Sequence, residues 1–183
     1  MELDASEQKY ALDLLASTAD RLISAVSGLP EVQWRFRPAA DRWSVAEILE
    51  HIVLLEQAFH SRVVVALQTG SAPLREASAV DSLVISRVPD RTVKYQAPAP
   101  LVPRGRWSES EGLHGFAEIR ERTITFASDP TGFRDRTVDH PFLGPLDSYQ
   151  WVLMVALHSA RHTEQILEVV ALTDAPSTAA AAD

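Results

Sequence analysis

The chain has 183 residues, of which 46% are hydrophobic and 23% charged, and this length suits one domain with a sizeable buried core. Its 17 basic and 25 acidic side chains give a formal net charge of −8, which argues against binding to nucleic acid or to an anionic membrane, because both require a basic surface. Cysteine is absent, which excludes a disulfide scaffold, cysteine-bound zinc, an iron–sulfur cluster and a thiol nucleophile in the protein itself. Since neither a secretory signal nor an apolar run of about 20 residues is visible, we expect a cytoplasmic protein with no membrane span.

Four stretches have the apolar periodicity of amphipathic helices: residues 4–27, 45–69, 109–128 and 148–173. Each begins at a capping-box pattern, in which a Ser or Asp side chain and a Glu or Gln three residues later satisfy each other's backbone N–H groups. The four pairs are Asp4 with Glu7, Ser44 with Glu47, Ser108 with Glu111 and Asp147 with Gln150. Glycine or proline lies just beyond each stretch and ends the helix.

A long connection, residues 71–107, separates the second and third helices and holds five of the chain's 11 prolines. Its length is typical of a functional cover, a crossover or a mobile segment. Within it, residues 82–88 (SLVISRV) fit a short strand or a helical stretch equally well. Four helices with one long crossover predict an all-α fold, a four-helix bundle, rather than two hairpins whose apolar stripes would lack cover. We expect a single domain over residues 1–175 and a disordered tail over residues 176–183.

Three of the six histidines are candidates for a metal site. His158 and His162 lie four residues apart on the apolar stripe of the last helix, so both side chains face inward. His51 lies between Ile48 and Leu55 on the inner face of the second helix and supplies a third imidazole. A shared divalent cation would satisfy such buried rings in their neutral form, and three ligands would leave a coordination position open, as in catalytic zinc sites. Hydrogen-bonded core histidines are the alternative interpretation.

The other histidines are weaker candidates. His60 is expected at the rim or surface of the second helix, and His114 at the surface of the third. His140 precedes Pro141, which favours an extended conformation in a loop. A hydrogen-bonded loop histidine is the favoured interpretation of His140, with closure over the site as the alternative.

The segments RWSVAEILEHI (residues 42–52) and HPFLGPLDSYQWVLMVALHSARHTEQI (residues 140–166) resemble the DinB/YfiT-like superfamily of metalloenzymes. The resemblance extends over essentially the whole chain. It implies a four-helix bundle with a three-histidine site for nickel, zinc or another divalent transition metal, whose ligands would be His51, His158 and His162. It also implies chemistry like that of relatives that transfer low-molecular-weight thiols such as bacillithiol, or that use mycothiol in isomerisation, and a homodimeric assembly.

The favoured hypothesis is therefore a metal-dependent enzyme that transfers a low-molecular-weight thiol to a small electrophilic substrate, with a metal-dependent hydrolase as the close alternative. A non-catalytic stress-response binding or dimerisation module is the hypothesis of a different class. The sequence assigns no general base, because capping accounts for Glu47 and Glu164 is expected to face solvent. Four cations of the long connection are expected to be solvated, with recognition of an acidic thiol as the alternative: Arg91, Lys94, Arg104 and Arg106. Together with residues 131–146, this connection is expected to shape the substrate entrance.

Overall fold

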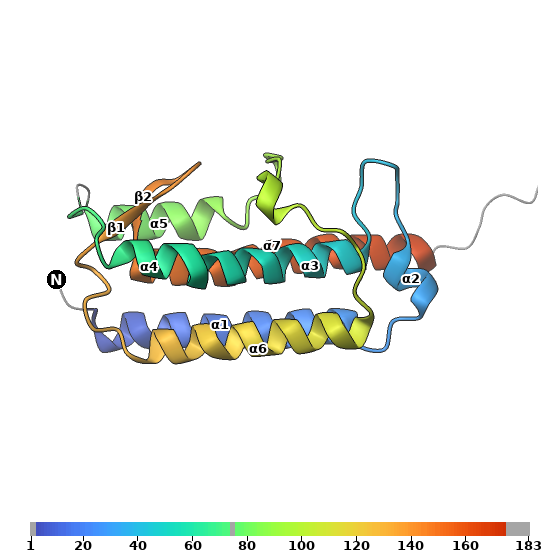
Figure 1. Ribbon diagram of the computed structural model, residues 1–183, viewed down its shortest axis with the longest axis horizontal. Helices are drawn as coiled ribbons and strands as arrows, with labels where there is room; N and C mark the ends of the chain where they lie inside the picture. Colours follow the sequence, from blue (N-terminus) through green and yellow to red (C-terminus); the bar gives the residue numbers. More distant parts are fainter. Residues whose placement is uncertain (1–2, 74–75, 175–183) are drawn as a thin grey trace, which may run out of the picture.

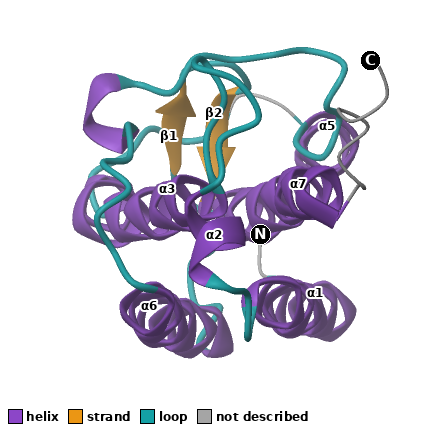
Figure 2. Ribbon diagram, turned by 90° about the vertical axis from the view of Figure 1, so that its right-hand side faces the viewer, coloured by secondary structure: helices purple, strands orange, loops and turns teal. Residues whose placement is uncertain are grey.

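The computed structural model describes residues 3–73 and 76–174 of the chain. Its long helices pack in two layers, with α1 beside α6 in one layer and α3 beside α7 in the other (Figures 1 and 2). These helices are α1 (Ala5–Val26), α3 (Val45–Ala58), α6 (Glu109–Ser128) and α7 (Ser148–Asp174). The predicted four-helix bundle is confirmed, and the predicted tail over residues 176–183 lies outside the described residues. None of the helices described is both long and apolar enough to cross a bilayer.

All four predicted capping boxes are present. At the start of α3, for example, the Ser44 hydroxyl accepts a hydrogen bond from the Glu47 amide, and the Glu47 carboxylate accepts one from the Ser44 amide. The same reciprocal pattern begins α1, α6 and α7. The caps fix where each helix starts, and so they fix which side chains its inner face presents.

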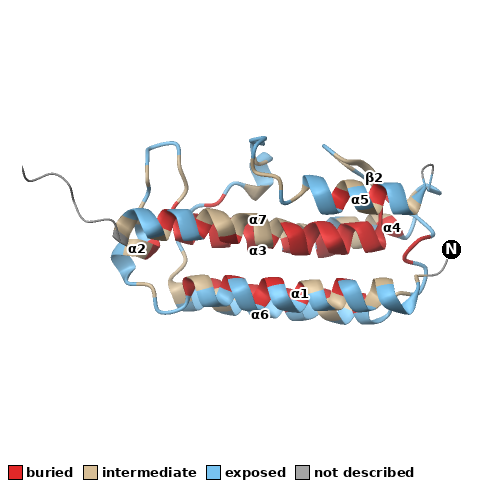
Figure 3. Ribbon diagram, turned by 180° about the vertical axis from the view of Figure 1, so that it is seen from behind, coloured by how far each residue is buried: buried red, intermediate tan, exposed pale blue. Residues whose placement is uncertain are grey.

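The apolar stripes of the four helices meet between the two layers and form the core (Figure 3). Each helix contributes fully buried residues, as the periodicity predicts: Leu15 and Leu22 from α1, Ile48 and Ile52 from α3, Phe116 from α6, and Ile166 from α7. A charged pair also crosses this core, where the Arg120 guanidinium contacts the Glu56 carboxylate at 3.0 Å. Arg120 donates further to the hydroxyls of Thr18 and Ser159, so the buried cation has partners on three other helices.

The second predicted helix is present without a break over residues 45–67, but it contains a π-helical turn that the sequence did not predict. After α3 the chain forms a π-helical turn, η1 (Phe59–Val63), and a short helix, α4 (Val64–Leu67). The connection that follows is not structureless, because it contains α5 (Ala77–Arg87) and a 3₁₀ turn, η2 (Ala99–Leu101). Residues 82–87 of the ambiguous SLVISRV segment are thus helical, with Val88 as the cap, and α5 packs against α7.

A short helix and a β-hairpin were also not predicted from the sequence. A short helix, α2 (Glu31–Arg35), follows α1. An antiparallel hairpin of β1 (Thr137–His140) and β2 (Gly144–Asp147) precedes α7, in the register Thr137 with Asp147 and His140 with Gly144. Figure 2 shows the hairpin and α5 above the α3–α7 layer, on the side opposite α1 and α6. This face of the bundle is therefore covered by the hairpin and by the long connection.

Candidate metal centre

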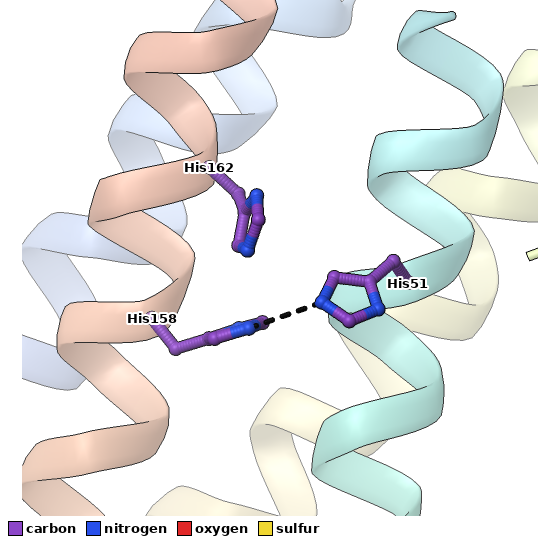
Figure 4. A group of neighbouring side chains, drawn as sticks. All are labelled: His51, His158 and His162. Atoms are coloured by element: carbon purple, nitrogen blue, oxygen red, sulfur yellow. Dashed lines mark hydrogen bonds between the residues drawn. The ribbon is translucent and has the colours of Figure 1, made fainter. Parts of the chain in front are cut away.

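The structure brings together the three histidines that the sequence singled out. His51 comes from α3 and His158 and His162 come from α7, and Figure 4 shows the rings converging between the two helices. One nitrogen from each ring lies within 4.8 Å of the others. The Nε2 atoms of His51 and His158 are 3.2 Å apart. Residues from distant parts of the chain thus place several nitrogen atoms around one point.

Two of the rings are held in a defined tautomer by acceptors outside the cluster. The Nδ1–H of His51 donates to the backbone carbonyl of Leu101, at 2.8 Å. The Nδ1–H of His162 donates to the side-chain oxygen of Gln165, at 2.9 Å. Because a neutral imidazole carries one proton, each Nε2 is left unprotonated, and that of His51 accepts a hydrogen bond from the Nε2–H of His158 at 3.2 Å. This is how metal-binding histidines are commonly oriented, with the second nitrogen bonded to a carbonyl or another acceptor.

The spacing of the rings suits a shared cation. Two imidazole nitrogens bound to one zinc ion at about 2.0–2.1 Å in tetrahedral geometry would lie about 3.3 Å apart. The observed 3.2 Å between His51 and His158 agrees with that value. Among the described residues, the Nδ1 atom of His158 is buried without a hydrogen-bond partner, so hydrogen bonds within the protein do not fully satisfy the cluster. The residues present therefore fit a divalent ion.

Burial keeps the three rings neutral at physiological pH. Desolvation lowers the pKa of His162 to about 3, and His51 lowers it further. Desolvation also lowers the pKa of His158 well below its ordinary value, with further contributions from His162 and His51. Desolvation also lowers the pKa of His51, against the opposing effect of its bond to Leu101. Neutral imidazole is the form that binds metal. Within the described ranges no carboxylate joins the cluster, so its donors are imidazole nitrogens, which suit zinc, nickel, copper and iron.

Comparison with known proteins agrees with the fold. The family model of the DinB superfamily matches residues 14–166. The chain belongs to the DinB superfamily. It is 25% identical to the uncharacterized protein YuaE of Bacillus subtilis (strain 168) over 146 residues, which cover 79% of this chain and 87% of YuaE.

Among solved structures, the chain is similar to YfiT from Bacillus subtilis, described as a probable metal-dependent hydrolase with an unusual four-helix bundle topology. The TM-score is 0.61 with 13% sequence identity, over 93% of this chain and 90% of YfiT. At this identity the likeness concerns the fold. The DinB-superfamily bundle therefore accounts for the helix arrangement that places the three histidines.

The other histidines of this DinB-superfamily chain have different environments. His60 was predicted at the rim or surface, but it is buried. The π-helical turn directs its ring toward α6, where Nε2 lies 2.9 Å from the Thr123 hydroxyl. His114 is exposed, as predicted. His140 ends β1 and is hydrogen-bonded through Nδ1 to the turn of the hairpin, as expected of a bonded histidine, although it lies in a strand rather than in a loop.

The charged residues considered from sequence lie around the centre rather than in it. Glu47 caps α3 and also binds Arg37. Glu164 points toward α1 and forms an ion pair with Arg21 at 2.5 Å. Neither carboxylate is therefore placed among the three rings.

The four cations of the long connection do not share one environment. Arg91 pairs with Glu168 of α7 through two hydrogen bonds of 2.6 and 2.7 Å, and Lys94 is exposed. Arg104 and Arg106 line a cavity of about 610 Å³ beside α3, together with Glu50, Leu54 and Trp107. The Glu50 carboxylate accepts hydrogen bonds from the backbone amides of Arg104 and Gly105, which ties this part of the crossover to α3.

Proposed function

We propose that this DinB-superfamily chain is a divalent-metal-dependent enzyme that acts on a small molecule, with His51, His158 and His162 as the metal ligands. The observation that carries the proposal is the arrangement of the rings. Two of them present a lone pair at Nε2 because their Nδ1–H groups are bonded elsewhere, and two Nε2 atoms lie 3.2 Å apart. Imidazole donors accept zinc, nickel, copper and iron, and we propose nickel or zinc because the resemblance to the DinB/YfiT-like superfamily implies one of these ions.

The chain's own residues hold the donors in place. Leu101 and Gln165 fix the orientation of two rings, and the Trp43 ring, 4.8 Å from that of His51, covers one side of the cluster. Three protein donors leave room for a small molecule, the arrangement typical of catalytic rather than structural zinc sites. A divalent ion bound here would lower the pKa of a water or thiol that it binds and would polarise an electrophilic substrate.

Two reactions are consistent with this chemistry. Hydrolysis is supported by the likeness in fold to YfiT, which is described as a probable metal-dependent hydrolase. Transfer of a low-molecular-weight thiol is the second proposal, and the thiol would have to be a cosubstrate because the chain has no cysteine. We also propose that the protein is a homodimer, which sedimentation equilibrium on the untagged chain would test.

Metal content is the first test. Untagged protein, dialysed against buffer without chelator, should retain about one equivalent of nickel or zinc by elemental analysis. His158→Ala should lose the metal and the thermal stabilisation that added metal provides. His114→Ala, which removes an exposed imidazole on α6, is the matched control and should behave as the wild type. Equal metal content and equal stabilisation in the wild type and His158→Ala would refute the proposal.

Turnover separates the two reactions. Metal-loaded protein would be incubated with activated esters and amides alone, and with electrophiles plus a panel of low-molecular-weight thiols. Hydrolysis without thiol that is lost in His51→Ala supports the hydrolase, whereas turnover that depends on added thiol supports the transferase. A protein that binds metal yet turns over nothing in either panel would favour the non-catalytic binding module.

A further inference from the structure

The cavity of about 610 Å³ lies between α3 and the part of the crossover that contains η2 and the residues after it. Glu50 and Leu54 of α3 line one side, and crossover residues between 99 and 107 line the rest. The volume is in the range of small-molecule sites, about 300–1,000 Å³. The residues that line this cavity do not include the three histidines, so it is separate from the candidate metal centre.

The cavity contains a buried carboxylate that the protein uses only in part. Glu50 is 6% exposed, and its Oε2 accepts hydrogen bonds from the backbone amides of Arg104 and Gly105, at 2.9 and 2.6 Å. Among the described residues Glu50 has no cationic partner, and its Oε1 accepts no hydrogen bond. Because Oε1 is not one of the fully enclosed atoms that lack a partner, it is open to the cavity that Glu50 lines. A cationic N–H donor on a ligand would satisfy this oxygen.

Two arginines supply the opposite charge in the same cavity. Arg104 and Arg106 both line it, and both are exposed. Within residues 3–73 and 76–174, neither guanidinium forms an ion pair or a hydrogen bond. Guanidinium groups bind carboxylates through paired N–H donors, so these two are available to an anionic group of a ligand.

The wall that carries the two arginines is held in place by bonds to neighbouring elements. The amide of Gly105 donates to Glu50, and its carbonyl accepts a hydrogen bond from Arg35 of α2. The carbonyl of Trp107 accepts one from the indole N–H of Trp34, at 3.0 Å. The cavity is therefore formed before a ligand binds, which lowers the entropic cost of binding.

We propose that this cavity binds a zwitterionic small molecule of dipeptide size, with its ammonium group at Glu50 and its carboxylate at Arg104 and Arg106. Leu54 and Trp107 add apolar surface for the side chains of the ligand. A simple anion would be repelled by Glu50, and a simple cation would be repelled by the two guanidinium groups. A molecule that carries both charges, such as an amino acid or a short peptide, satisfies all three side chains. This site goes beyond the proposed function, because it shares no lining residue with the metal centre.

Three matched probes test the recognition of both charges. They are L-leucyl-L-alanine, its N-acetyl derivative, which lacks the ammonium group, and its C-terminal amide, which lacks the carboxylate. Isothermal titration calorimetry at pH 7 should give a Kd of about 1 mM or tighter for the free dipeptide. Each blocked form should bind about tenfold more weakly, because one charge-assisted contact is lost. In ¹H–¹⁵N spectra the free dipeptide should shift the amide signals of Arg104 and Gly105, which Glu50 binds.

Substitutions in the cavity should act selectively on these probes. Glu50→Gln keeps an acceptor for the two crossover amides but removes the negative charge, so it should weaken the free dipeptide about tenfold and leave the N-acetyl form unchanged. The double variant Arg104→Gln/Arg106→Gln should weaken the free dipeptide and leave the C-terminal amide unchanged. Lys94→Gln removes an exposed cation of the same crossover outside the cavity, and as the control it should match the wild type.

His158→Ala separates this site from the metal centre. Binding in the cavity should be unchanged in this variant, whereas a peptide bound to a metal ion at the histidines would lose affinity. Three other results would overturn the assignment: a free dipeptide that does not bind saturably, blocked forms that bind as tightly as the free dipeptide, and equal affinity in the wild type and Glu50→Gln. Loss of dipeptide binding in His158→Ala also overturns it. A chain that binds no metal would refute the proposed function and leave this site standing.

Discussion

Acid should destabilise this fold through His60, a histidine outside the candidate metal centre. Its side chain is 6% exposed, and Nε2 lies 2.9 Å from the Thr123 hydroxyl. Desolvation, with a contribution from the charge of Arg122, lowers the pKa of His60 to about 4 in the folded protein. In the unfolded chain the pKa returns to about 6.5. The unfolded state therefore binds a proton that the folded state does not, and stability that is present above pH 6.5 is lost as the pH falls toward 4.

The size of the effect follows from the two pKa values. Protonation of His60 in the unfolded state lowers the free energy of unfolding by about 1.4 kcal/mol for each pH unit below the unfolded pKa. At pH 5, about 1.5 units below that pKa, the loss of stability is about 2 kcal/mol. His60→Gln removes the titrating group and leaves an amide that can reach the Thr123 hydroxyl. Urea unfolding with EDTA at pH 7 and at pH 5 should therefore show the wild type losing about 2 kcal/mol more than the variant.

The comparison isolates one group among several. Burial also lowers the pKa values of His51, His140, His158 and His162, so the total loss of stability in acid should exceed the share of His60. Those contributions are common to the wild type and His60→Gln, and they cancel in the difference. His114→Gln, at an exposed position on α6, is the control and should retain the pH dependence of the wild type. Equal losses in the wild type and His60→Gln between pH 7 and pH 5 would refute the reasoning.

Three further substitutions test the core, the centre and a helix start. Glu56→Ala leaves the Arg120 guanidinium buried without its carboxylate, and urea unfolding should report a loss of about 3–5 kcal/mol. Gln165→Leu removes the acceptor for the Nδ1–H of His162, and zinc affinity, measured by competition with a chromophoric chelator, should fall about 10–100-fold. Ser44→Ala removes the side-chain cap of α3 and should cost about 1 kcal/mol in thermal unfolding.

Each of these substitutions has a result that would contradict its rationale. If the double variant Glu56→Leu/Arg120→Met is no more stable than Glu56→Ala, the penalty does not come from an unpaired buried charge. Unchanged zinc affinity in Gln165→Leu would mean that the orientation of His162 does not depend on its partner. Unchanged thermal stability in Ser44→Ala would show that Glu47 alone holds the start of α3.

The bundle was predictable because the signals that define it are local. Helices α1, α3, α6 and α7 each begin at a capping box, which needs residues three apart, and each carries an apolar stripe, which needs residues three or four apart. The observed start of each helix agrees with its cap. The inner faces follow from those starts, and this is why the sequence could place His51, His158 and His162 on facing surfaces.

Elements that depend on distant contacts were not predictable in the same way. The continuous periodicity after Ala58 gives no sign of the π-helical turn that buries His60 against α6. The β1–β2 hairpin contains Pro145 and only short strands, and it is held by contacts such as the bond from Trp151 to Val138. The apolar residues of α5 form no clear stripe along one face, so the sequence does not distinguish its helix from a strand, and packing against α7 decides the matter.

The chemistry of the centre depends on one of these distant contacts. His51 is useful as a ligand only if its proton is on Nδ1, and the acceptor that holds it there is the carbonyl of Leu101, in the crossover. The preceding residue, Glu50, accepts hydrogen bonds from two backbone amides of the same crossover, those of Arg104 and Gly105. Two neighbouring residues of α3, Glu50 and His51, thus bind the crossover, so the proline-containing connection helps to orient a ring of the candidate metal centre in addition to joining two helices. Any change that lifts residues 99–105 from α3 should release the His51 ring even though the bundle itself is unchanged.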